Sequence, residues 1–357
     1  MAEKNIWWSQ VGSARALIDN IVGNLLDSGV SVILTVPEDM PWENNFDEIV
    51  RERLYASAGR SPVTICCDGC ETMKDFTALA LDQFCKRDHR IRYRYNRPIG
   101  TFVGENPVAT IHDNVVVVEG AVSGNLQWWA DFVRDYTRAA EVSSQDGNGK
   151  HGTFYIKVKE GAEITPSREV VHIEYSRAIS QYSRHAFYAV AAEEAGCNYH
   201  MCDYLVELLL LCCGEDVELG YICLKAYSEF LRSPYKVMTR IRKSFGRKGA
   251  ENVYDNDLFE REIFKAQLKT LFPLIEEFRL DFIQRNEKII RDSGILRDEN
   301  VSDPADLELG TYYYYRDRLA VPEGLKDKLK RYREYRNRLA HLQILTNEEA
   351  ETILLRK

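Results

Sequence analysis

The sequence has no long apolar run, no internal repeat and no low-complexity tract. Its longest apolar stretch, Leu208–Cys213, is far shorter than the about 20 residues that a membrane-spanning helix needs. The first residues, Met1–Asn5, lack the apolar core of a secretory signal. Nine cysteines, an odd number, are typical of a reducing compartment. We therefore expect a cytoplasmic protein that does not contact a membrane.

The chain also lacks the overall positive charge of a general nucleic-acid-binding protein, since its formal charge is −8. The charge is uneven, however. Residues 325–341 carry a net charge of +5, with seven basic residues against Asp327 and Glu334. The basic residues are Lys326, Lys328, Lys330, Arg331, Arg333, Arg336 and Arg338. This segment is either a site for a polyanion or a solvated helix face.

Metal-binding spacings are scarce. Cys67 and Cys70 form one CxxC pair without a second pair at zinc-ribbon spacing, and Cys197, His200 and Cys202 form a looser group. Buried, unreactive cysteine explains both groups better than a metal or redox site. We predict neither a metal nor a cofactor.

In the first half, short β-branched segments alternate with helical ones. Predicted strands lie at 30–36, 63–67, 115–118 and 154–158, and predicted helices at 13–26, 45–54, 72–86 and 126–140. Strands separated by helices favour a parallel sheet, so the pattern predicts an α/β domain over residues 1–165. After it we predict a helical middle region at 166–250 and an all-α helical bundle at 251–357. A long helix at 258–291 contains Pro273, where we expect a bend.

Residues 10–160 resemble the nucleotide-binding core of P-loop ATPases in their order of strands, and Val115–Val118 followed by Glu119 resembles a Walker B strand. The phosphate-binding loop is missing. After the first strand the chain reads Pro37-Glu38-Asp39-Met40-Pro41-Trp42, without the glycines and lysine that cradle phosphates. We therefore predict a degenerate P-loop-like domain without ATP hydrolysis. A generic doubly wound docking domain, with Glu119 as a plain acid at a strand end, is the alternative.

The most informative residues are Arg336, Asn337 and His341. They lie on an amphipathic helix whose apolar residues recur at steps of three and four: Leu325, Leu329, Tyr332, Tyr335, Leu339 and Leu342. At about 100° per residue, Asn337 and His341 share a face one turn apart, and Arg336 lies beside the apolar stripe. Arginine can hold a phosphate and histidine can carry a proton near neutral pH. RNA cleavage without a metal needs both abilities.

This Arg-x4-His segment resembles the motif of the HEPN family, whose members are small helical bundles, often dimers and often metal-independent ribonucleases of toxin or antiphage systems. The resemblance implies catalytic roles for three residues. Arg336 would bind the scissile phosphate, His341 would act as general acid or base, and Asn337 would orient either of them. It also implies RNA contacts for the surrounding basic residues Lys330, Arg331, Arg333 and Arg338.

These expectations describe a metal-independent endoribonuclease effector of a toxin or antiphage defence system. Its partners would be RNA, a second copy bound through the C-terminal bundle, and a partner protein of the same system docked on the N-terminal domain. The apolar stripe from Leu325 to Leu342 is the expected dimer contact. The alternative is a HEPN-like scaffold that binds a partner and cleaves nothing, with Arg336 in an intramolecular ion pair.

Overall fold

The computed structural model describes residues 2–59, 61–143, 151–159, 164–165, 167–245 and 256–356. The chain divides into two compact units, residues 1–184 and 185–357. The first is α/β and the second is helical, as the sequence predicts. The boundary predicted at 250/251 lies outside the described residues.

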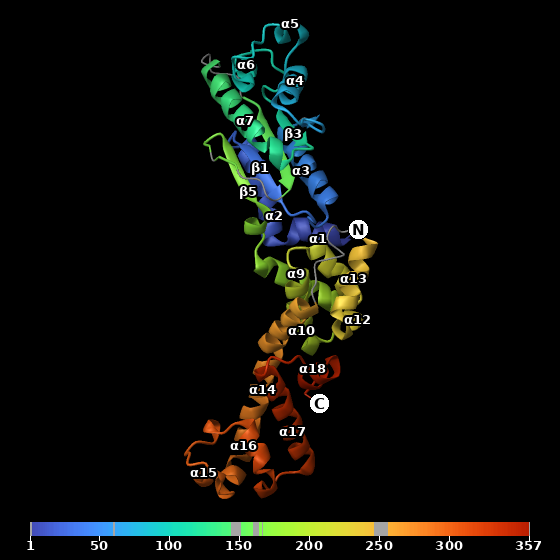
Figure 1. Ribbon diagram of the computed structural model, residues 1–357, viewed down its shortest axis with the longest axis vertical. Coiled ribbons are helices and arrows are strands. Elements are labelled where there is room, and N and C mark those ends of the chain that lie inside the picture. Colours follow the sequence, from blue (N-terminus) through green and yellow to red (C-terminus); the bar gives the residue numbers. More distant parts are fainter. Residues whose placement is uncertain are drawn as a thin grey trace. The chain divides into compact units, whose positions relative to one another are not determined.

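The first unit is built on a five-stranded parallel sheet in the order β2-β3-β4-β1-β5 (Figure 1). The strands are β1 (Ser31–Val36), β2 (Val63–Cys66), β3 (Val115–Glu119), β4 (Thr153–Lys159) and β5 (Val170–Glu174). Strand β5 lies beyond the predicted domain end at residue 165, in a region predicted to be helical. It pairs with β1 from Ser31↔Val170 to Thr35↔Glu174, so the α/β domain extends past that boundary.

Helices cover both faces of the sheet. Helices α2 (Gly12–Leu26) and α3 (Glu43–Ala58) pack together on one face, whereas α7 (Ser123–Ser143) packs on the other. The alternation of side chains along β4 shows this directly: Phe154 and Ile156 join the aromatic core under α7, and Lys157 reaches α3. The other helices of this unit are α1 (Ala2–Gln10), α4 (Met73–Phe84), α5 (Arg87–Arg90), α6 (Ile99–Gly104) and α8 (Tyr175–Ala178).

Two glycines let α6 lie against α7. A Cβ at Gly100 would lie 2.4 Å from the Phe132 carbonyl oxygen, and one at Gly104 would lie 2.5 Å from that of Tyr136. Both contacts are with backbone, which cannot move aside, so only glycine permits this approach.

The second unit is organised around the long helix α14 (Asn256–Asp292), which contacts α10, α17 and α18 (Figure 1). Its backbone leaves helical angles at Asn286 (φ −121°), not at Pro273, where the sequence suggested a bend. The other α-helices are α9 (Gln181–Glu194), α10 (Tyr199–Cys213), α11 (Val217–Lys225), α12 (Tyr227–Arg232), α13 (Pro234–Ser244), α15 (Ile295–Asp298), α16 (Leu309–Tyr314), α17 (Glu323–Ala340) and α18 (Asn347–Leu354). Two 3₁₀ turns lie at Pro304–Asp306 and Arg316–Arg318.

Candidate functional site

Helix α17 carries the residues predicted to bind or cleave RNA, except His341, which lies just beyond its end. Pro322 precedes the helix and Glu323 lies in its first turn, both favourable at a helix N-terminus. The apolar stripe is buried at Leu329, Tyr332, Tyr335 and Leu339, because α17 packs on α14 and α16 of the same chain. These four residues are therefore core, whereas Leu325 is half-buried and Leu342 is exposed. The expectation that the stripe forms the contact between two copies is corrected, because its central residues already pack within one chain.

The turn that holds His341 is tightly fixed. The Gln343 amide donates to the Arg338 carbonyl (2.9 Å) and the Leu342 amide to the Leu339 carbonyl (3.2 Å), the pattern of a Schellman cap. A buried glutamine of α14 anchors the residues that follow: Gln267 donates to the Leu345 carbonyl (2.9 Å) and accepts from the Leu345 amide (2.7 Å). The position of His341 thus depends on the backbone hydrogen bonds of the cap and on the Gln267 side chain, which holds the chain just after the turn.

The cap places Leu342 at φ +60°, a conformation that usually requires glycine. The Leu342 side chain is 77% exposed, so it gains little from packing. We expect Leu342→Gly to raise the free energy of unfolding by up to about 1 kcal/mol. Left-handed backbone costs a non-glycine residue about 1–2 kcal/mol, and glycine removes this cost. Part of the benefit is offset because glycine loses more conformational entropy on folding than leucine does. Chemical denaturation monitored by circular dichroism measures the change. A lower free energy of unfolding would show that the turn is not strained.

Arg336 is held by two carboxylates of its own chain. Its Nε donates to Glu276 of α14 and its Nη1 to Glu308, which directly precedes α16, both at 3.1 Å. The arginine side chain is 24% exposed and that of Glu308 is 65% exposed. These pairs explain how a cation can lie beside the apolar stripe. Binding a phosphate here requires the exposed partner, Glu308, to give way.

Asn337 and His341 are both exposed and line one small pocket of about 380 Å³. Its other lining residues are Glu334, Arg338, Gln343 and Glu349. Arg336 does not line it, and at about 100° per residue it projects about 140° around the helix from His341. The structure therefore brings together Asn337 and His341 and places Arg336 on another side of the same helix.

The four basic residues predicted to contact RNA fall into two groups. Lys330 and Arg331 are exposed. Arg333 lies over the Tyr313 ring, 4.2 Å from its centroid. Arg338 donates to both carboxylate oxygens of Glu349 at 2.6 Å and to the Ile344 carbonyl. Lys330 and Arg331 remain available to a polyanion, whereas Arg333 and Arg338 already have partners.

Sequence reasoning did not identify Glu276, Glu308, Gln267 and Glu349 as parts of this site. Three of them come from α14 and from the segment before α16, far from α17 in the chain. Only Glu349 had a local signal, since Thr346 and Glu349 form a capping box at the start of α18.

In the α/β unit, the carboxyl edge of the sheet is occupied by ion pairs. Lys157 of β4 donates to Glu43 (2.8 Å) and Asp47 (2.6 Å), and Lys159 donates to Glu43 (2.8 Å). Burial would raise the pKa of Glu43, but hydrogen bonds and charges from Lys157 and Lys159 outweigh it and lower this pKa. For Asp47 burial prevails over Lys157, and the pKa is raised. These pairs lie where a parallel α/β sheet usually binds its ligand.

Glu119, at the end of β3, is likewise paired, with Arg51 of α3. The loop between β1 and α3 runs from residue 37 to 42, and Trp42 takes a left-handed conformation (φ 45°) next to the helix start. Glu43 lies in the first turn of α3, the helix whose N-terminal amides would bind phosphate in a P-loop. The charges at this edge thus favour internal pairing.

We expect the purified chain to show no steady ATP hydrolysis, because the residues at the carboxyl edge pair with one another and the loop lacks glycine and lysine. Phosphate release from ATP and Mg²⁺ measures this, with Glu119→Gln as the comparison. Steady hydrolysis that Glu119→Gln abolishes would contradict the prediction.

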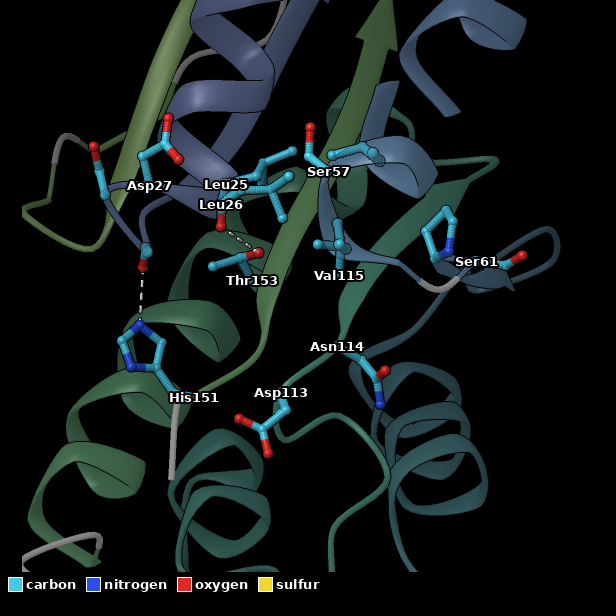
Figure 2. Close-up of a pocket in the computed structure, with 15 residues that line it drawn as sticks. Leu25, Leu26, Asp27, Ser57, Ser61, Asp113, Asn114, Val115, His151 and Thr153 are labelled. Atoms are coloured by element: carbon cyan, nitrogen blue, oxygen red, sulfur yellow. Dashed lines mark hydrogen bonds between the residues drawn. The ribbon is translucent and has the colours of Figure 1, made fainter. Parts of the chain in front are cut away.

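A pocket of about 630 Å³ opens at the opposite, amino edge of this sheet (Figure 2). Figure 2 shows His151, whose Nε2 lies 2.9 Å from the Gly29 carbonyl oxygen, and Thr153, whose hydroxyl donates to the Leu25 carbonyl (3.1 Å). Asp27 and Asp113 also line the pocket. Two carboxylates in its wall disfavour an anionic ligand, so the pocket does not replace the missing phosphate loop.

Across the described ranges, no group of three or more His, Cys, Asp and Glu side chains is arranged to hold a metal ion. Burial raises the pKa of the Cys67 thiol to about 11 and also raises that of Cys70, which opposes thiolate formation.

No helix in the described part of the chain is long and apolar enough to cross a membrane. Comparisons of the chain with protein-family models, with curated proteins and with solved structures give no match.

Proposed function

We propose that the helical unit is a HEPN-like, metal-independent endoribonuclease, the effector of a toxin or antiphage defence system. The observation that carries the proposal is the exposed pair Asn337 and His341, fixed at the end of a basic helix by the cap and by Gln267. Lys330 and Arg331 are exposed on the same helix and would attract the RNA backbone.

In this proposal His341 takes the proton from an RNA 2′-hydroxyl, whose oxygen attacks the adjacent phosphorus. The 5′-oxygen of the next nucleotide leaves and receives a proton, so the products are a 2′,3′-cyclic phosphate and a 5′-hydroxyl. Asn337 lies beside His341 and would orient its ring. Arg336 would stabilise the phosphate charge after exchanging Glu308 for the RNA.

One chain offers one His341, whereas acid and base catalysis together need two proton carriers. A homodimer with two-fold symmetry supplies the second one. Since the apolar stripe of α17 is buried within the chain, we propose that the dimer forms through the exposed side of the bundle that bears Asn337 and His341. The α/β unit would be the docking site for a partner protein, since the carboxyl edge of its sheet is occupied by ion pairs.

Incubation of the purified chain with RNA in EDTA tests the proposal. We expect cleavage that is unchanged by EDTA or by added Mg²⁺. A wild-type protein that leaves RNA intact at every protein concentration, or that requires Mg²⁺, would contradict it.

The ion pairs of Arg336 favour a second candidate function, a scaffold that binds a partner and cleaves nothing. Glu308→Gln separates the two. If Arg336 serves RNA, removing its exposed competitor should increase cleavage several-fold, since one charge-assisted hydrogen bond is worth about 1.5–3 kcal/mol before solvent screening. Glu287→Gln, at an exposed position of α14, is the matched control. Absence of cleavage in both wild type and Glu308→Gln favours the scaffold, whereas cleavage that Glu308→Gln leaves unchanged shows that Arg336 does not serve RNA.

A further inference from the structure

A second pocket of the helical unit lies between α14, α17 and the residues around the end of α18, with a volume of about 420 Å³. This volume is within the range of small-molecule sites, about 300–1,000 Å³. Three cations line it, Arg285, Lys328 and Arg356, together with the rings of Phe278 and Tyr332. Nothing in the proposed cleavage at His341 uses this pocket: Lys328 and His341 are separated by 13 positions of α17, or about 20 Å along the helix axis.

Lys328 is the central cation of the pocket. Its Nζ lies 5.7 Å from the centroids of both the Phe278 and the Tyr332 rings and donates to the Arg356 carbonyl (3.0 Å). Among the residues that the structure describes, no carboxylate lies within ion-pair distance of it. Burial, followed by the charges of the arginines around it, lowers the pKa of Lys328. An anion placed here would relieve this repulsion.

The two arginines of the pocket are paired with carboxylates that also line it, Asp281 and Glu277. Arg285 lies 3.6 Å from Asp281 and Arg356 lies 3.0 Å from Glu277, and all four side chains are more than half exposed. Exposed pairs of this kind contribute little to stability, so either arginine can turn to a ligand at small cost. With Lys328 included, the lining has an excess of one positive charge.

The rings provide a surface for a planar group. Phe278 and Tyr332 lie 4.1 Å apart between centroids, and Phe278 is only half-buried, so part of its ring is open to the pocket. The break of α14 at Asn286 lies in the same wall, where the Asn286 side-chain amide donates to the Phe282 carbonyl (2.8 Å). Departures from regular helix geometry often occur at ligand sites.

We propose that this pocket binds a phosphomonoester attached to a planar ring system. The phosphate would contact Lys328 with Arg285 and Arg356, and the ring system would pack against Phe278. A free nucleoside 5′-monophosphate and the 5′-phosphorylated end of an RNA strand share this chemistry. The pocket, its cations and its rings belong to one chain, so binding does not require cleavage at His341.

Isothermal titration calorimetry of the full chain tests the proposal. The probes are AMP, adenosine, and an oligoadenylate RNA with either a 5′-phosphate or a 5′-hydroxyl. We expect binding of AMP, of the phosphorylated RNA or of both, and no measurable binding of adenosine. Binding of the phosphorylated RNA without AMP identifies an RNA end as the source, and binding of AMP alone identifies a free nucleotide.

Variants locate the binding. Lys328→Gln should weaken it about tenfold or more, because it removes one charge-assisted contact worth at least about 1.4 kcal/mol. Phe278→Leu should also weaken binding, because it removes the aromatic ring while keeping most of the side-chain volume in the core. Lys288→Gln, the same charge change at an exposed position of α14 outside the pocket, should bind as wild type does.

Equal affinity of Lys328→Gln and wild type would overturn the proposal, as would equal affinity for AMP and adenosine, or no binding of either phosphorylated probe at about 1 mM. Circular dichroism of each variant confirms that it is folded. Since binding is measured and not cleavage, failure here leaves the ribonuclease proposal standing. Conversely, a chain that binds AMP through Lys328 but never cuts RNA supports the pocket and contradicts the ribonuclease.

Discussion

His341→Ala is expected to reduce RNA cleavage by about 10²–10⁴-fold, the usual contribution of a general acid or base. The fold should be unaffected, because the His341 side chain is exposed and the cap uses backbone groups at this position. The measurement is the initial rate of cleavage of a labelled RNA in EDTA, with circular dichroism as a check of folding.

The matched control is His200→Ala. His200 is also an exposed histidine of the helical unit, in the first turn of α10. Its replacement should leave the rate within about twofold of wild type, since it has no place in the proposed site. If His341→Ala and wild type cleave RNA at the same rate, His341 is not the proton carrier and the assignment of the site is wrong.

Leu329→Asp has the largest expected effect on stability. Leu329 is 0% exposed in the contact between α17 and the rest of the bundle, so the change removes a buried aliphatic side chain and inserts a carboxyl group. Losing the leucine alone costs about 2–5 kcal/mol, and the unpaired polar group adds to this. We expect the helical unit to unfold at a much lower denaturant concentration or not to fold at all.

Lys330→Asp is the control for Leu329→Asp, because it introduces the same side chain one residue further on, at an exposed position. Its effect on unfolding should be within about 0.5–1 kcal/mol. If the apolar stripe joined two copies, as the sequence alone suggests, Leu329→Asp would instead give folded monomers. A Leu329→Asp protein that is folded and merely monomeric would show that the stripe contacts a second copy and not α14.

The α/β architecture could be predicted because its signals are local. Val115–Val118 are all buried in β3, as their continuous apolar run indicates, and α7 after this strand has clear apolar spacing. Strand β5 was missed because Val170–Glu174 is a short edge strand with polar His172 and Glu174. Its pairing with β1 is set by the sheet and not by its own five residues.

The candidate site was predicted in part. The shared face of Asn337 and His341 follows from helical periodicity, and the structure places both in one pocket. The partners of Arg336 could not be predicted, because Glu276 and Glu308 come from 60 and 28 residues away in the chain. Periodicity shows that Arg336 borders the stripe, but tertiary packing decides which charges meet it.

The most direct test of the central claim is the chemistry of the RNA ends that the wild-type chain produces in EDTA. Cleavage by 2′-hydroxyl attack predicts fragments with a 2′,3′-cyclic phosphate and a 5′-hydroxyl, identified by mass spectrometry, and no such fragments with His341→Ala. Fragments with a 5′-phosphate, or cyclic-phosphate fragments formed equally well by His341→Ala, would contradict the account.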